Sequence, residues 1–381
     1  MATWDFLVIG GGIAGVSVAA ELAPYGRTLV LEQESALGYH ATGRSAAIVV
    51  PNYGAPPLRA LTQASLPTLL EIEVEGHLLA HRKGSLMLEL PGQEGVLQAS
   101  LEDPDRQGRM HEVTLDEALQ RVPILRREAI VRAGWEPDVW ALDADGLLQW
   151  YRRRARAAGA EFRLNAKVTA LERVGDVWQV TAGGATEQAG TVVNAAGAWA
   201  DTLATRAGLR PLGLQPKRRT ALTVPAPTGH DVQGWPAVID LGETRYFKPD
   251  AGALMLSLAE ETDSPPCDAW ADDEDVATAV DRVQQIADLP VDRVISTWAG
   301  LRTFAPDRVP VVGWARDGEG FLWLAGQGGY GLQTAPAMAQ LAASIALDTA
   351  PPAALSLARV DASALSPGRL TPGLEPLRAS A

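Results

Sequence analysis

The sequence predicts an α/β fold built around a parallel sheet, and three observations support this prediction. An apolar run of strand type over residues 5–9 leads directly into a cluster of glycines over 10–15. A stretch rich in Ala and Val over 13–22 favours a helix, and a second apolar run follows over 28–32. The order strand, glycine turn, helix, strand is typical of parallel α/β units. Hydrophobic residues make up 47% of the 381 residues and charged ones 21%, which excludes a disordered or fibrous chain.

The composition also limits partners and location. With 33 Lys and Arg against 46 Asp and Glu the formal charge is −13, so we expect no nucleic-acid partner. The single cysteine, Cys267, cannot form an intramolecular disulfide, and no third ligand accompanies His77 and His81, so no metal site is expected. No apolar run approaches the roughly 20 residues of a membrane span, and the N-terminus lacks the basic segment of a signal peptide. We expect a cytoplasmic protein without an integral membrane segment.

The first glycine cluster predicts a dinucleotide site. Gly10 permits the tight turn after the strand, Gly12 lets the backbone approach a pyrophosphate, and Gly15 lets helix and strand pack closely. Glu32 ends the second strand, roughly 20 residues after the first glycine, where a carboxylate accepts hydrogen bonds from the ribose hydroxyls. This fingerprint is shared by FAD and NAD enzymes and does not separate them.

Three later segments favour a flavin over a nicotinamide. Residues 39–47 form a loop of small side chains where a dehydrogenase would continue with helices and strands, and such a loop suits contact with a planar ligand. Residues 191–199 form a strand that runs into another glycine turn. Residues 326–334 are a second glycine-rich loop, and the helical run 337–347 follows it. The positive end of that helix would stabilise negative charge on a reduced flavin.

With these motifs the chain resembles the glycine oxidase and D-amino-acid oxidase group of FAD enzymes, and within it most closely the bacterial D-arginine dehydrogenases. The resemblance implies a GR2-type flavoprotein, with a Rossmann-like FAD-binding domain and a substrate domain formed by an antiparallel sheet. It spans nearly the whole chain. The matching stretches are 5–15, 31–47, 193–199, 212–219, 246–252, 297–304 and 327–334.

The resemblance divides the chain into discontinuous domains. We expect an FAD-binding domain over 1–50, 141–210 and 297–350, and a substrate-binding domain over 51–140 and 211–296. The remaining segment, 351–381, is expected to wrap the surface. The acidic run 272–275 favours the first turn of a helix, where carboxylates suit the dipole.

The resemblance also implies which residues contact FAD. We expect the cofactor to be bound non-covalently, because Cys267 lies outside the matching motifs. The expected contacts are Gly10, Gly12, Ile13, Ala14, Gly15, Glu32, Gln33, Thr42, Gly43, Arg44, Ser45, Ala46, Ala47, Val168, Ala196, Gly197, Trp199, Gly300, Arg302, Gly328, Gly329, Tyr330, Gly331, Leu332 and Gln333.

A few polar residues are candidates for catalysis. A guanidinium fork is well suited to bidentate capture of an amino acid's carboxylate. Arg302 and Arg219 match arginines that the family uses for this purpose, although Arg218 is a rival to its neighbour and any arginine can be a plain surface charge. The tyrosines Tyr53 and Tyr246 match hydroxyls that complete the clamp, although both also suit ordinary packing. The resemblance also places Gly329, in the second glycine-rich loop, among the catalytic residues.

Departures from the D-arginine dehydrogenases concern the substrate side chain. No acidic residue stands in 84–87, where the family places a glutamate, while Ile48 and Val50 replace a histidine and a threonine. A buried cation without a counter-charge costs several kcal/mol. We therefore predict oxidative deamination of D-amino acids with uncharged, mainly apolar side chains. The rivals are an oxidase of secondary amines such as sarcosine or D-proline and a non-catalytic flavin-binding subunit. The electron acceptor, oxygen or a quinone, is left open.

Overall fold

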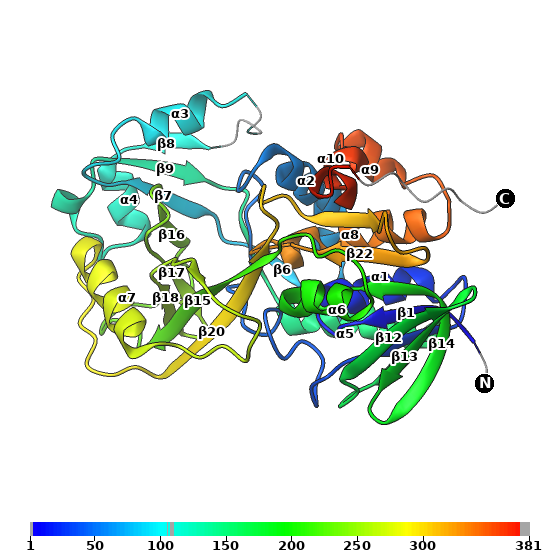
Figure 1. Cartoon of the computed structure of the whole chain (residues 1–381). Coiled ribbons are helices and arrows are strands. Elements are labelled where there is room, and N and C mark those ends of the chain that lie inside the picture. Colours follow the sequence, from blue (N-terminus) through cyan, green and yellow to red (C-terminus); the bar gives the residue numbers. More distant parts are fainter. Residues whose placement is uncertain (1–2, 105, 107–109, 374–381) are drawn as a thin grey trace.

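Two sheets make up most of the fold. Figure 1 shows the computed structural model, which describes residues 3–104, 106 and 110–373. The first sheet lies on the right of Figure 1 with the helices α1, α5, α6 and α8, and the second lies on the left with α3, α4 and α7. These helices span Ile13–Leu22 (α1), Val96–Glu102 (α3), Leu115–Arg121 (α4), Ala144–Ala157 (α5), Ala200–Arg206 (α6), Asp273–Ile286 (α7) and Gly331–Ala346 (α8).

The first sheet contains the parallel unit predicted from the N-terminal sequence. Its central strand β1 pairs in parallel with β2 on one side and β14 on the other, and β22 also runs parallel to β14. An antiparallel meander, β12 to β14, extends it. Its strands are β1 (Trp4–Ile9), β2 (Thr28–Leu31), β11 (Glu161–Arg163), β12 (Val168–Val174), β13 (Val177–Ala182), β14 (Ala185–Asn194), β21 (Val311–Trp314) and β22 (Phe321–Ala325).

Strand β1 is buried on both faces, as a central parallel strand should be. Phe6 and Val8 point into the core under α1, α5 and α8, while Leu7 and Ile9 point into the opposite core beside α6. This alternation follows from the two-residue period of a strand. The helix predicted over 13–22 is confirmed as α1. The helical run predicted over 337–347 lies in α8, which begins earlier than expected, at Gly331 within the second glycine-rich loop.

The second sheet is antiparallel apart from one parallel pairing, between β16 and β7. Its order is β19-β15-β18-β17-β16-β7-β9-β8, and β20 pairs with β15 along its whole length. The strands are β7 (Ser85–Glu89), β8 (His111–Val113), β9 (Arg132–Glu136), β15 (Gln215–Val224), β16 (Ala237–Asp240), β17 (Tyr246–Asp250), β18 (Ala253–Ser257), β19 (Thr262–Asp263) and β20 (Ser296–Phe304).

The packing departs from the expected domain boundaries at α2 (Pro56–Glu71). This helix lies in the segment expected in the substrate-binding domain, yet Leu61 and Leu69 belong to the same core as α1 and α8. The reason is a pair of buried hydrogen bonds, since the amide of Gln333 in α8 donates to Thr62 Oγ1 and the backbone N–H of Ala337 donates to Ser65 Oγ. Helix α2 therefore packs as part of the first unit.

The C-terminal segment also contributes to this core rather than only wrapping the surface. Leu355 of α9 (Ala353–Leu357) and Leu365 of α10 (Ala362–Leu365) are buried in it. Residues 374–381 of the expected tail, and residues 1–2 of the expected FAD-binding domain, lie outside the described residues.

The remaining strands are short. Strands β3 (Ile48–Val49), β6 (Ala80–Arg82) and β10 (Trp140–Leu142) form a small antiparallel sheet, and β4 (Glu73–Val74) pairs with β5 (His77–Leu78). His77 and His81 therefore lie on strands and not on a helix. In the described ranges no cluster of three His, Cys, Asp or Glu residues is arranged to hold a metal ion, and no helix there is long and apolar enough to cross a membrane.

Candidate active site

One large cavity runs between the glycine turn after β1 and the facing surface of β15, β17 and β18. Its volume is about 1660 Å³ including its opening to solvent. Sites for drug-sized ligands usually measure about 300–1000 Å³, so this one has room for a dinucleotide and a small substrate together.

The glycine turn shapes the nucleotide end of the cavity. A Cβ atom at Gly10 would lie 2.3 Å from the carbonyl oxygen of Ala195, and one at Gly15 would lie 1.9 Å from the carbonyl oxygen of Gly10. Both positions therefore exclude any larger residue, because backbone stands in the way. At Gly12 a Cβ would meet only Thr42 Oγ1, at 3.3 Å. Gly12 faces the cavity and leaves its backbone open to a ligand.

Glu32 and Thr42 organise the start of α1. The carboxylate of Glu32 accepts hydrogen bonds from the backbone N–H groups of Gly11, at 2.6 Å, and Glu34, at 2.9 Å. Thr42 Oγ1 accepts one from the N–H of Ile13 at 3.0 Å. Glu32 and Thr42 both line the cavity, so each connects the loop geometry to the ligand space.

Most of the residues expected to contact the cofactor do line this cavity. They come from both ends of the chain and from the middle, which the first sheet brings together. The lining includes Gly10, Gly12, Ile13, Ala14, Glu32, Gln33, Thr42, Arg44, Ser45, Ala46, Val168, Ala196, Gly197, Trp199, Gly300, Arg302, Gly328, Gly329, Gly331 and Leu332.

Three expected contacts beside the glycine turns lie outside the lining. Gly15 packs helix against strand, as described above. Gly43 closes a turn, since its N–H donates to the carbonyl oxygen of Gly38 at 2.7 Å. Ala47 has a φ of +51°, and its carbonyl oxygen accepts a hydrogen bond from the N–H of Leu142 at 2.8 Å. All three shape the loops and do not face the ligand space.

Two further expected contacts, at the start of α8, point away from the cavity. Tyr330 packs its ring against Tyr53, with centroids 5.1 Å apart, and against Phe304. Gln333 is buried, and its Oε1 accepts from the backbone N–H of Val50 while its Nε2 donates to Thr62. In a helix, successive residues point in different directions, so Gly331 and Leu332 face the cavity while Gln333 faces α2.

The substrate end of the cavity contains two arginines. Arg219 on β15 is buried, and its Nε donates to the carbonyl oxygen of Glu260 at 2.7 Å. Burial, followed by the positive charge of Arg302, lowers the pKa of Arg219 below its ordinary value. Arg302 on β20 is half-buried, and in the described part of the chain its guanidinium forms no hydrogen bond or ion pair. Arg302 is therefore free to bind an anion.

The choice between Arg218 and Arg219 follows from the strand geometry. Neighbouring residues on a strand point to opposite faces. Arg218 donates to the carboxylate of Asp275 on α7 at 2.6 Å, whereas Arg219 lines the cavity. Arg219 is thus the arginine that faces the ligand space.

Gly329 leaves room for the arginine clamp. It lines the cavity, and a Cβ atom there would lie 2.9 Å from Arg302 Nη1. Any side chain at this position would push the guanidinium aside. The glycine is therefore required by the position of Arg302.

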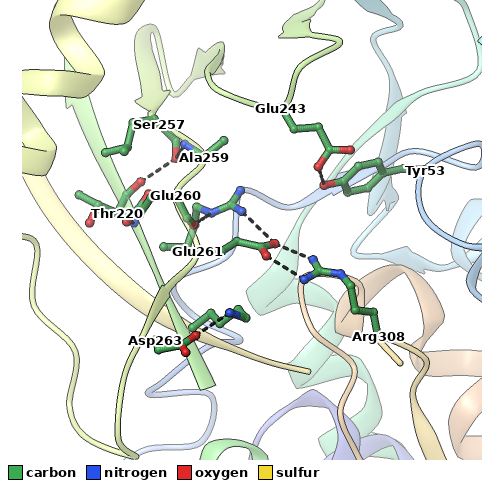
Figure 2. A network of polar contacts seen from close by, with 12 residues as sticks. Tyr53, Thr220, Glu243, Ser257, Ala259, Glu260, Glu261, Asp263 and Arg308 are labelled. Atoms are coloured by element: carbon green, nitrogen blue, oxygen red, sulfur yellow. Dashed lines mark hydrogen bonds and ion pairs between the residues drawn. The ribbon is translucent and has the colours of Figure 1, made fainter. Parts of the chain in front are cut away.

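The two candidate tyrosines differ in placement. Tyr246 lines the cavity and packs with Ala221 and Met255. Tyr53 is not part of the lining, and its hydroxyl donates to the carboxylate of Glu243 at 2.9 Å, as Figure 2 shows. Burial is the main cause that raises the pKa of Tyr53, and its hydroxyl is therefore a neutral hydrogen-bond donor.

Apolar side chains surround Tyr246. Ala46, Ala221 and Met255 are buried in one cluster with it, and Ile48 and Ile239 pack on that cluster. Met87 is the cross-strand neighbour of Ile239 and lies on the same face of the second sheet. Leu86, in the segment 84–87 where the related dehydrogenases place a glutamate, is buried in the core toward α7, because it points to the opposite face.

The cavity fits a polar cofactor. Thr303 Oγ1 and Gln327 Nε2 belong to lining residues and are buried, yet within the described residues neither has a hydrogen-bond partner. Buried polar groups are normally paired, so a site with unpaired ones suits a ligand that brings donors and acceptors. Cys267 also lines the cavity, and its Sγ lies 3.6 Å from Ser264 Oγ.

Comparison with known proteins decides the family. Residues 5–345 match the protein family described as FAD dependent oxidoreductase. The chain belongs to this family. The D-amino-acid oxidase of Streptomyces coelicolor is 31% identical to it over 359 residues, which cover 90% of this chain and 96% of that relative.

Two solved structures share the fold of this FAD-dependent oxidoreductase. Glycine oxidase from Geobacillus kaustophilus has a TM-score of 0.79 at 22% identity, covering 92% of this chain and 96% of that one. L-alpha-glycerophosphate oxidase from Mycoplasma pneumoniae, with FAD bound, has a TM-score of 0.80 at 18% identity, covering 91% and 95%. The predicted family, fold class and cofactor are confirmed. The protein is an FAD-dependent oxidoreductase of the amino-acid and amine oxidase type.

Residues that sequence reasoning missed surround Arg219. Glu261 lies 3.5 Å from its guanidinium, and Arg308 holds Glu261 with two hydrogen bonds. Neither lies in a matching stretch, and no local pattern marks them. Ala221 was in principle visible, because it stands two positions after Arg219 and so faces the same side of β15.

Proposed function

We propose that the protein oxidises D-amino acids with uncharged, mainly apolar side chains to imino acids, which hydrolyse to 2-oxo acids and ammonia. The observation that carries this proposal is the placement of Arg302 and Arg219 in one cavity, where the Arg302 guanidinium has no partner among residues 3–104, 106 and 110–373. A fork of this kind matches the geometry of a carboxylate. The likeness to a relative named D-amino-acid oxidase supports the configuration of the substrate.

The residues of this chain supply orientation and not acid or base catalysis. Arg302 and the terminal nitrogens of Arg219 would hold the carboxylate, and Tyr246, which lines the same cavity, would fix the α-carbon. FAD, when bound, would supply the acceptor for the hydride of that carbon. Holding the substrate and the cofactor in the reactive orientation removes the entropic cost of bringing them together, which otherwise slows the reaction. The amine is expected to bind in its neutral form.

The apolar cluster around Tyr246 supports an uncharged side chain in the substrate. Ala46, Ala221 and Met255 line the cavity and offer contact area, and each buried methylene gains about 0.8 kcal/mol. Ile48 and Ile239 pack on the same cluster. Glu89, the acidic residue nearest in sequence to the expected glutamate position, does not line the cavity, and its carboxylate accepts a hydrogen bond from the N–H of Leu97 at 3.0 Å. It therefore does not offer a counter-charge to a substrate cation.

Anaerobic reduction of the flavin tests the proposal. The purified protein is mixed without oxygen with D-leucine, D-methionine, D-phenylalanine and D-arginine, with the L-enantiomers, and with sarcosine and D-proline. We expect D-leucine, D-methionine and D-phenylalanine to bleach the flavin absorbance. The highest kcat/KM of the panel should belong to one of these three. A higher value for D-arginine than for all three would refute the side-chain preference.

The same panel separates the two rival functions. Bleaching by sarcosine or D-proline, with none by primary D-amino acids, would identify a secondary-amine oxidase. Flavin that no amine in the panel reduces, while dithionite does, would support a non-catalytic flavin-binding subunit.

A further inference from the structure

A chain of three charged side chains lies behind the arginine clamp. Arg308 donates from both terminal nitrogens to the carboxylate of Glu261, at 2.8 and 2.7 Å. Glu261 Oε1 in turn lies 3.5 Å from Arg219 Nη2. Figure 2 shows Glu261, in the loop after β18, with its carboxylate turned toward the Arg308 guanidinium.

Glu261 is a potential competitor for the substrate. Its carboxylate is chemically the same group that Arg219 is expected to bind, and it is tied to the chain a few ångströms away. An arginine fork prefers two parallel hydrogen bonds to one carboxylate. In this structure Glu261 accepts two hydrogen bonds from Arg308 and makes only a longer contact with Arg219.

We propose that Arg308 is a positioning residue of the substrate site, which holds Glu261 away from Arg219 and so keeps Arg219 available to the substrate's carboxylate. This inference rests on the proposed function. The remaining contact of Arg219, from Nε to the carbonyl oxygen of Glu260, orients its guanidinium but adds no net charge to the site.

Arg308 is itself fixed in place. The guanidinium carbon of Arg308 lies 4.1 Å from the centre of the Phe304 ring, and the backbone N–H of Arg308 donates to the carbonyl oxygen of Ala305 at 2.8 Å. Its φ of +62° places it in a tight turn after β20. Arg302 lies on β20 and Arg308 lies in the turn that follows this strand, so the arginine that holds Glu261 and the free arginine of the clamp are close in sequence.

The charge on Glu261 is maintained at neutral pH. Burial alone would raise its pKa, but the hydrogen bonds from Arg308, and then the charges of Arg308, Arg219 and Lys217, bring the pKa below its ordinary value. Lys217 is itself paired with Asp263. A carboxylate that stays ionised competes for Arg219 whenever Arg308 is removed.

A double-mutant cycle with a carboxylate probe tests this inference. The variants are Arg308→Met, Glu261→Gln and both together, and the probe is benzoate, whose binding is followed by the change in flavin absorbance. In Arg308→Met we expect the Kd of benzoate to rise about tenfold, which is the effect of about 1.4 kcal/mol. In the Glu261→Gln background the same change should alter the Kd less than about twofold, because the competing charge is gone.

Turnover gives a second readout. In Arg308→Met the KM of the best D-amino acid should rise about as much as the Kd, while kcat changes little, since saturating substrate displaces Glu261. Arg369→Met is a matched control. Arg369 pairs with Asp307, next to Arg308, and does not approach Arg219, so its loss should leave the Kd unchanged.

Two results would overturn the inference. One is an Arg308→Met variant that retains FAD and binds benzoate as tightly as the unmodified protein. The other is a double variant as weak as Arg308→Met alone, which would mean that Arg308 contributes through its own charge or through folding. If the unmodified protein neither binds benzoate nor is reduced by any D-amino acid, the proposed function fails first.

Discussion

Replacement of Arg302 by methionine probes the clamp with little disturbance of the fold. Methionine keeps roughly the length of the side chain and removes the fork. In the described part of the chain the Arg302 guanidinium has no protein partner, so the variant loses no hydrogen bond of the folded state. The effect should therefore be confined to ligand binding.

The expected magnitude follows from the lost contact with substrate. One bidentate, charge-assisted contact contributes about 3 kcal/mol. At about 1.4 kcal/mol per factor of ten, kcat/KM should fall roughly 150-fold. Thermal stability and FAD content should stay near those of the unmodified protein.

Arg218→Met is the matched control for this measurement. Arg218 is the neighbour of a clamp arginine, but its guanidinium pairs with Asp275 on the opposite face of the sheet. Its loss should lower thermal stability and leave the kinetics within a factor of about 2, since an ion pair of this kind contributes about 1 kcal/mol. Unchanged kinetics in Arg302→Met would show that another residue captures the carboxylate, whereas loss of FAD from the variant would show that Arg302 is needed to hold the cofactor.

Three further predictions concern the cofactor and the buried acids. Gly12→Val should give a folded protein without FAD, whereas Gly15→Val should fail to fold, because only the second meets backbone; circular dichroism and flavin absorbance separate the two. Acid precipitation should release the yellow cofactor into solution, and colour left in the pellet would indicate a covalent link for which Cys267 is the candidate. Burial raises the pKa of Glu136 to about 7. A raised carboxyl pKa stabilises the fold at low pH, and this contribution is lost as the pH rises from about 4.5 through 7, by on the order of 3 kcal/mol. Glu136→Gln should therefore show a smaller drop in melting temperature between pH 5 and 8 than the unmodified protein, and an equal drop would contradict the assignment.

The sequence was sufficient for the first unit because local signals there coincide with the fold. The glycines at 10 and 15 are required by backbone contacts that any chain with this turn makes. It was insufficient where the outcome depends on packing. Gln333 stands in a matching motif but turns toward α2, because the helix period places it on that side. Whether Arg218 or Arg219 faces the ligand depends on the phase of a strand, which the two neighbouring arginines do not reveal.

The long-range contacts of the site were equally hidden. Arg308 and Glu261 are separated along the chain and meet only when β20 pairs with β15. Helix α2 joins the first unit through hydrogen bonds to α8, which also come from distant segments. In both cases the local sequence of one segment gives no sign of the segment that it contacts. These contacts are therefore visible only in the structure.

The cavity that fits the cofactor is lined by residues from the beginning of the chain and from a late segment, and this has a consequence for how the protein is made. Gly12 and Thr42 line the cavity near the start, while Gly329 and Leu332 line it at the N-terminal end of α8. During synthesis on the ribosome the early residues emerge long before α8. Until α8 emerges, the apolar side chains that pack against it stay exposed to water. Domains fold as units once their segments are available. Flavin capture should consequently come as one of the last events of biogenesis, and nascent chains stalled before residue 331 should remain colourless and depend on chaperones.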